Sequence, residues 1–149
     1  MNLEPDFSEF IACLNAHEVR SLIVGGYAVG AHGLPRGTKA LDVWVLADRE
    51  NADALMSALE QFGFGDVGLT ALDFIGPDVV VQLGCAPIRI DILTSIDGVE
   101  FIAAYPLRMD GTIDGLRISF IGREQLIANK RAAGRRQDLA DADRLEGLE

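Results

Sequence analysis

The chain has 149 residues, 49% of them hydrophobic, and a net charge of −10. This length predicts a single domain, residues 1–149, that is large enough for a hydrophobic core. No window approaches the roughly 20 apolar residues of a membrane span, and the acidic N-terminus lacks the basic and apolar regions of a secretory signal. We therefore expect a cytoplasmic protein with no membrane association, and the negative charge disfavours a broad nucleic-acid-binding surface.

The first half of the chain alternates between helical and strand patterns. The expected elements are a helix at residues 6–18 that begins at Asp6, a strand at 22–24, a helix at 27–32, a strand at 38–46 and a helix at 48–62 that is capped by Asp48. The glycine pair Gly25-Gly26 lies between the first strand and the second helix, where it predicts a tight turn with exposed backbone amides.

The second half is richer in strands. We expect a loop with a short edge strand at 63–77, strands at 79–83 and 88–93 joined by a turn at 84–87, a short helix at 99–104, a strand at 116–121, and helices at 123–133 and 136–145. This order predicts an α/β (α+β) sandwich with a mixed sheet flanked by helices. Its core spans about residues 20–121, and the C-terminal helices span about 123–146.

Single residues add further expectations. Cys13 and Cys85 show neither a metal-ligand spacing nor a disulfide framework, so we interpret them as reduced core thiols. Trp44 and Phe74 are expected in the core. Five basic residues crowd together near the C-terminus, namely Arg123, Lys130, Arg131, Arg135 and Arg136. They fit either a local positive patch for a small polyanion or a solvated helix face.

Two carboxylates lie in the middle of predicted strands, Asp42 in LDVWV and Asp91 in IRIDIL. Burying an unpaired charge costs several kcal/mol, so each carboxylate needs a partner, which is either an ion pair or a ligand. If the two strands are neighbours, the carboxylates converge on one face and suit a hard cation such as Mg²⁺. In the last helix, Asp138 and Asp141 lie three residues apart, and we interpret them as ion-pair partners rather than substrate contacts.

The order of these motifs resembles the nucleotidyltransferase superfamily with its DNA-polymerase-β-like core. The family pattern is a glycine pair at a strand-to-helix turn, then Asp-x-Asp on the next strand, then an aspartate on a later strand. Here Gly25-Gly26-Tyr27, Ala40-Leu41-Asp42 and Asp91 stand in those places. The segments VGGYAVGAHGLPRGTKALDVWV and LIANKRAAGRRQDLADADRL are similar to the bacterial AbiEii-like group, which includes toxins of toxin–antitoxin systems.

The resemblance implies transfer of a nucleotide from an NTP such as ATP to an acceptor hydroxyl, with two Mg²⁺ (or Mn²⁺) ions. It makes Asp42 and Asp91 the catalytic metal ligands. The implied nucleotide-binding and phosphate-binding residues are Gly25, Gly26, Tyr27, Arg36, Thr38, Lys130 and Arg135. The implied acceptor is RNA, a protein or a small molecule, and an antitoxin is a possible partner.

Ala40 stands where the family has its first metal-binding aspartate, and a methyl group cannot ligate a cation. We therefore expect this chain to be nearly inactive. Two explanations are open: an engineered alanine that preserves the fold, or a natural member that binds nucleotide without transferring it. The alternative functions are a non-catalytic nucleotide-binding or interaction module of the same fold, an antibiotic nucleotidyltransferase, or a structural protein that binds no nucleotide.

Overall fold

A mixed six-stranded sheet with the strand order β3-β4-β2-β1-β6-β5 forms the centre of the protein. The computed structural model describes residues 3–38, 40–85 and 87–148. The strands are β1 (Ser21–Val24), β2 (Ala40–Val45), β3 (Val80–Cys85), β4 (Ile88–Leu93), β5 (Met109–Ile113) and β6 (Leu116–Phe120). The neighbours β2 and β4 run parallel, whereas the two central strands β1 and β2 run antiparallel. The predicted mixed sheet flanked by helices is confirmed.

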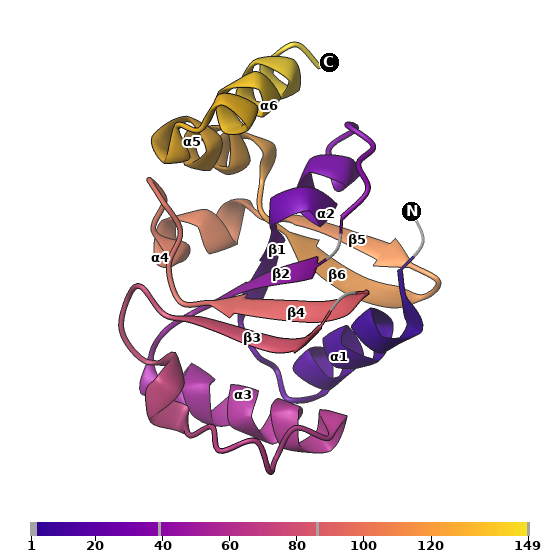
Figure 1. The fold of residues 1–149 in the computed structure, drawn as a ribbon, viewed down its shortest axis with the longest axis vertical. Helices are drawn as coiled ribbons and strands as arrows, with labels where there is room; N and C mark the ends of the chain where they lie inside the picture. Colours follow the sequence, from indigo (N-terminus) through magenta and orange to yellow (C-terminus); the bar gives the residue numbers. More distant parts are fainter. Residues whose placement is uncertain (1–2, 39, 86, 149) are drawn as a thin grey trace.

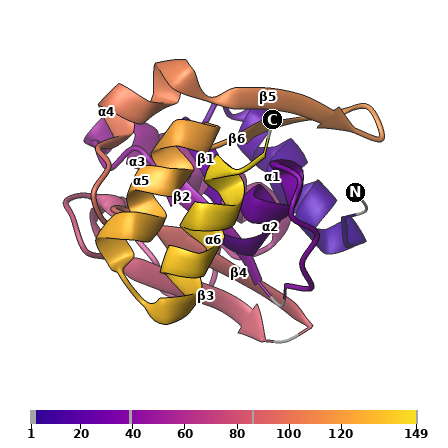
Figure 2. The ribbon, with the colours of Figure 1, turned by 90° about the horizontal axis from the view of Figure 1, so that it is seen from above.

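Helices cover both faces of this sheet (Figure 1). One face carries α1 (Pro5–Ala16) and α3 (Arg49–Phe62). The other face carries α2 (Gly25–Ala31), α4 (Phe101–Ala104), α5 (Arg123–Ala133) and α6 (Arg136–Glu146). Seen from above, α5 and α6 lie across the middle of the sheet (Figure 2). No helix within the described residues is long and apolar enough to cross a membrane.

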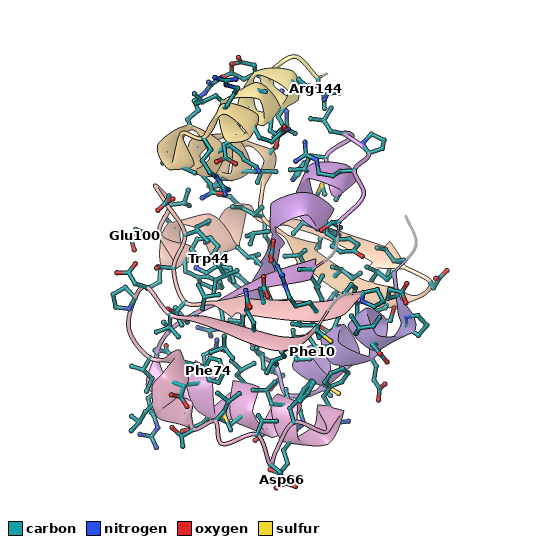
Figure 3. The ribbon with its side chains drawn as sticks, viewed as in Figure 1. Phe10, Trp44, Asp66, Phe74, Glu100 and Arg144 are labelled. Carbon is teal, nitrogen blue, oxygen red and sulfur yellow. The ribbon has the colours of Figure 1, made fainter. Side chains whose placement is uncertain are left out.

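The side chains of β2 divide between the two faces because successive residues of a strand point in opposite directions. Leu41 and Val43 are fully buried in the core. Trp44 packs edge-on against Phe101 of α4, with 5.0 Å between ring centres. The even-numbered residues of β2, Asp42 among them, therefore face the side of α2 and α4. Figure 3 shows Trp44 on this side, and Phe10 and Phe74 on the side of α1 and α3.

Two predicted helix starts are wrong. α1 begins at Pro5, with Glu4 in the N-cap position and no side-chain cap, so Asp6 lies in the first turn. Proline suits this place because its missing N–H would have no partner in the first turn of a helix. α2 begins at Gly25, so the glycine pair belongs to its first turn and does not precede it.

Two other local predictions also need correction. Residues 71–74 form a 3₁₀ helix, and the described loop at 63–77 contains no edge strand. Thr70 and Asp73 form a capping box there, which favours a helical turn. Cys85 is exposed at the end of the edge strand β3, whereas Cys13 is buried as expected, and both are free thiols.

A buried ion-pair network holds the C-terminal helices to the loop between α2 and β2. Arg36 in that loop donates to Asp141 of α6 through both terminal nitrogens, at 2.7 and 2.5 Å. Lys130 of α5 lies 3.3 Å from Asp138 and 3.3 Å from Asp141. Because Asp138 and Asp141 are 2% and 0% exposed, the ion-pair interpretation of these two aspartates is confirmed.

Other basic residues of the C-terminal stretch are also engaged within the fold. Arg123 donates to the carbonyl oxygen of Leu145 in the last turn of α6 and to that of Leu148 just beyond the helix. Arg131 pairs with Asp143 and Glu146. Four of the five basic residues of the stretch therefore have partners within the fold, whereas Arg136 is exposed and forms no ion pair with a described residue.

We expect Asp141→Asn to lower the free energy of unfolding by about 3 kcal/mol, because it removes the carboxylate of a buried pair and leaves the partner charge behind. The Asp141 carboxylate has a pKa well below its usual range, chiefly because Arg36 donates to it. Urea denaturation at neutral pH measures the loss. The matched control is Asp53→Asn, which breaks a pair with Arg49 in which both side chains are more than half exposed. Equal losses in the two variants would contradict the network's role.

Candidate active site

Asp42 and Asp91 are direct neighbours across the parallel strands β2 and β4. Directly paired residues of adjacent strands point to the same face, so the two carboxylates converge as the sequence predicts. Asp91 is 7% exposed, which makes it one of the few buried charged residues of the protein. The site therefore places two acidic groups in a poorly solvated position beneath α2.

Burial, and after it the proximity of Asp91, changes the ionisation of Asp42. Burial raises the pKa of Asp42 to about 6, and the charge and hydrogen bonding of Asp91 add to the rise. Positive charges of Arg89 and Lys130 act in the opposite direction. The two carboxylates resist simultaneous ionisation because their negative charges repel each other. A bound cation would relieve this repulsion.

The glycine pair is required by the close approach of α2 to these strands. Gly25 has a φ of +67°, and a Cβ atom there would overlap Oδ2 of Asp42. A Cβ atom on Gly26 would lie 2.9 Å from the Cβ atom of Thr38. Side chains at these positions would push α2 away from Asp42, so the pair has a packing reason as well as a conformational one.

Arg89 is the site residue that sequence reasoning missed. It is the direct strand partner of Ala40, on the same face as the two carboxylates. Its Nη2 donates to Oδ2 of Asp91 at 3.1 Å. The signal was present in the sequence, since IRIDIL puts Arg89 two residues before Asp91, but its meaning depends on the register with Ala40.

The donor set fits one divalent cation better than two. Oδ1 of Asp91 is buried and has no hydrogen-bond partner among the described residues, which leaves it open to a cation together with Asp42. Ala40 stands at the family's first aspartate position, and Arg89 already neutralises part of the acidic charge. Among the residues that the structure describes, no group of three His, Cys, Asp or Glu could hold a metal. Mg²⁺ is often held by one or two carboxylates plus substrate phosphates.

The predicted nucleotide-binding residues fall into three places. A cavity of about 500 Å³ beside α2 is lined by Gly26, Tyr27, Gly30, Pro35, Arg36, Gly37 and Thr38. Gly25 lies against Asp42, and Lys130 is close enough to lower the pKa of that carboxyl. Arg135 stands apart, because its side chain is 81% exposed and reaches Lys130 only through their shared partner Asp138.

No family model matches the sequence, and no curated protein matches it. Solved structures match over most of the chain. A candidate nucleotidyltransferase from Thermotoga maritima is 12% identical, with a TM-score of 0.58 over 94% of this chain and 88% of that one. An antigenic nucleotidyltransferase-like protein from Paracoccidioides brasiliensis is 14% identical, with a TM-score of 0.60 over 93% of this chain and 72% of that one.

A third match is the antibiotic-resistance factor ANT(2″)-Ia, solved in complex with adenylyl-2″-tobramycin. It is 15% identical, with a TM-score of 0.57 over 93% of this chain and 84% of that one. The chain has a nucleotidyltransferase fold. At this level of identity the likeness concerns the fold, and the chemistry of the site has to be argued from the residues described above.

We expect Asp42→Asn to stabilise the protein at pH 7. A folded-state pKa of about 6, against 3.8 for the unfolded chain, costs the native state up to about 3 kcal/mol once Asp42 is ionised in both states. The cost is absent below the unfolded-state pKa and grows as the pH rises towards the folded-state pKa. Urea denaturation of both proteins should therefore show a larger gain at pH 7 than at pH 4. A gain that is the same at both pH values, or a loss at pH 7, would contradict the raised pKa.

Proposed function

We propose that the chain binds a nucleoside triphosphate at the Asp42–Asp91 pair, and that with aspartate at position 40 the same site transfers a nucleotide to an acceptor hydroxyl. The observation that carries this proposal is the register of the two carboxylates beneath Gly25 of α2, within a nucleotidyltransferase fold. The buried carboxylate pair costs free energy in the absence of a cation. Stability therefore requires neither this pair nor the close approach of a glycine to it.

Each residue then has a defined task. Asp42 and Asp91 would hold Mg²⁺ (or Mn²⁺), and the cation would supply the charge that stabilises the transferring phosphoryl group. Lys130, held by two buried aspartates, adds a fixed positive charge on the same side. Both terminal nitrogens of Arg36 donate to Asp141, so its main task is to hold the loop that carries Thr38 against α2.

Ala40 limits this chain in two ways. It removes one carboxylate from the family's set of three, and it leaves Arg89 with Asp91 as its carboxylate partner. The loss should reduce transfer by orders of magnitude, because charge stabilisation is usually the largest part of catalysis in such sites. We therefore propose that this chain is an inactive or impaired member.

The finer assignment to the AbiEii-like group rests on the two end segments, and a toxin role with an antitoxin partner follows from it as part of the proposal. The acceptor on this reading is RNA, a protein or a small molecule. A second function is favoured by Ala40 and Arg89 together, namely a non-catalytic module that binds an NTP. An antibiotic nucleotidyltransferase shares the fold, as ANT(2″)-Ia illustrates.

The decisive variant is Ala40→Asp, incubated with each labelled NTP and total cell RNA and protein in the presence of Mg²⁺. We expect at least about a hundredfold more label transfer than with the unchanged chain. The control is the double variant Ala40→Asp/Asp42→Asn, which should lose this gain. Calorimetric titration of the unchanged chain with NTPs separates the two functions. NTP binding without restored transfer supports the non-catalytic module, and no NTP binding by either protein rejects both functions.

A further inference from the structure

Most of the hydrogen-bonding capacity of Arg89 is unused, although its guanidinium lies at the carboxylate pair. Nη2 donates to Oδ2 of Asp91 at 3.1 Å. Nε is buried and has no hydrogen-bond partner among the described residues, and Nη1 forms no hydrogen bond with any of them. Because a guanidinium has several N–H donors and no acceptor, its single bond to Asp91 leaves it able to bind a second anionic group.

Two other basic residues near this site are engaged more fully. Lys130 lies 3.3 Å from both Asp138 and Asp141. Arg36 donates to Asp141 through both terminal nitrogens. The side chain of Arg89, in contrast, is 38% exposed and has one carboxylate partner within the described part of the chain. Of these three basic residues, Arg89 therefore has the most capacity left for a ligand.

The alanine at position 40 accounts for this unused capacity. Ala40 and Arg89 are direct partners on the parallel strands β2 and β4, and neighbouring strands lie about 5 Å apart. A carboxylate at position 40 would therefore lie beside the guanidinium and accept hydrogen bonds from it. The methyl group of Ala40 accepts none, so the N–H groups of Arg89 stay available.

A phosphate group fits these N–H groups better than a neutral ligand does. A guanidinium binds phosphate oxygens through pairs of charge-assisted hydrogen bonds, which are stronger than neutral ones. The charge of Arg89 also reaches Asp42, since it acts to lower the pKa of that carboxyl. Arg89 is therefore close to both carboxylates at which the nucleotide is proposed to bind.

We propose that Arg89 is a phosphate-binding residue, whose available N–H groups donate to the polyphosphate of the nucleotide beside the cation that Asp42 and Asp91 would hold. This inference rests on the proposed function, because it concerns the ligand of the same site. It gives Arg89 two opposite effects. The guanidinium competes with a cation for Asp91, but it attracts the phosphates that the cation accompanies, so a single variant separates the two effects.

The test is Arg89→Gln, titrated calorimetrically with ATP and with inorganic tripolyphosphate at saturating Mg²⁺. We expect both affinities to fall about tenfold below those of the unchanged chain, because charge-assisted bonds to phosphate are lost. The losses should match, since Arg89 contacts the phosphates and not the base. If Arg89 were only the counter-ion of Asp91, its removal would leave both affinities unchanged or raise them.

The matched control is Arg117→Gln, which removes one positive charge from an exposed residue of β6, two strands away from β2. It should leave both affinities unchanged. Position 40 supplies a second test, because an aspartate there accepts hydrogen bonds from Arg89. In the Ala40→Asp background, Arg89→Gln should therefore cost less than about threefold in affinity, which shows the coupling of the two positions.

The proposal is overturned if Arg89→Gln binds tripolyphosphate as tightly as the unchanged chain does, if Arg117→Gln weakens binding as much, or if the loss is equally large in the Ala40→Asp background. The two ligands distinguish this failure from that of the proposed function. ATP binding that Arg89→Gln leaves unaltered rejects only the role of Arg89. Tripolyphosphate binding that depends on Arg89, without any binding of ATP, rejects only the proposed function, and binding of neither compound rejects both.

Discussion

Asp42 and Asp91 face each other across β2 and β4. The repulsion between their charges is the constraint to which the surrounding residues are fitted. Burial together with this repulsion raises the pKa of Asp42 to about 6. The protein answers with two positive charges, Arg89 on the neighbouring strand and Lys130 on α5, which both act to lower that pKa. Gly25 allows the first turn of α2 to lie directly against the Asp42 carboxylate. The stability cost of this pair and the close approach of α2 to it support the proposal that it is a binding site.

The C-terminal helices place Lys130 near this site. Its charge is already paired with Asp138 and Asp141 in the folded protein. Asp141 receives hydrogen bonds from Arg36 and Gln137 and lies 3.3 Å from Lys130, although it is fully buried. The network connects the loop after α2 with α5 and α6, segments that lie about a hundred residues apart in the sequence. Lys130 is therefore fixed in place before any ligand arrives, which lowers the entropy that a phosphate contact would have to overcome.

Much of the fold could be predicted because the periodic patterns are strong. The strand IRIDIL matches β4 over its whole length, Asp48 caps α3 by accepting from the N–H of Asn51, and both C-terminal helices begin where the pattern places them. The start of α2 and the helical turn at 71–74 cannot be predicted in this way, because short helices depend on close packing and local caps rather than on periodicity.

The carboxylate pair could be foreseen from residue types and order, but the surroundings of the pair could not. Arg89 gains its meaning only from a register that sets it opposite Ala40, and register is a property of the assembled sheet. The Arg36–Asp141 pair is likewise invisible to local patterns. The basic stretch near the C-terminus fits two interpretations in the sequence, and only the packing of α5 against α6 shows that most of its charges are used internally.

The most direct test counts the Mn²⁺ ions that bind to the unchanged chain. Electron paramagnetic resonance measures this number in a titration without nucleotide. It shows whether the carboxylate pair, with Arg89 beside it, holds a single cation. We predict one Mn²⁺ per chain, lost in Asp91→Asn, and bound about tenfold more tightly in Arg89→Gln, because the guanidinium no longer competes for Asp91. Arg108→Gln is the control, since it removes an ion pair of the same spacing next to the edge strand β5. Two bound ions in the unchanged chain, or an affinity that Arg89→Gln leaves unaltered, would contradict the single-cation site.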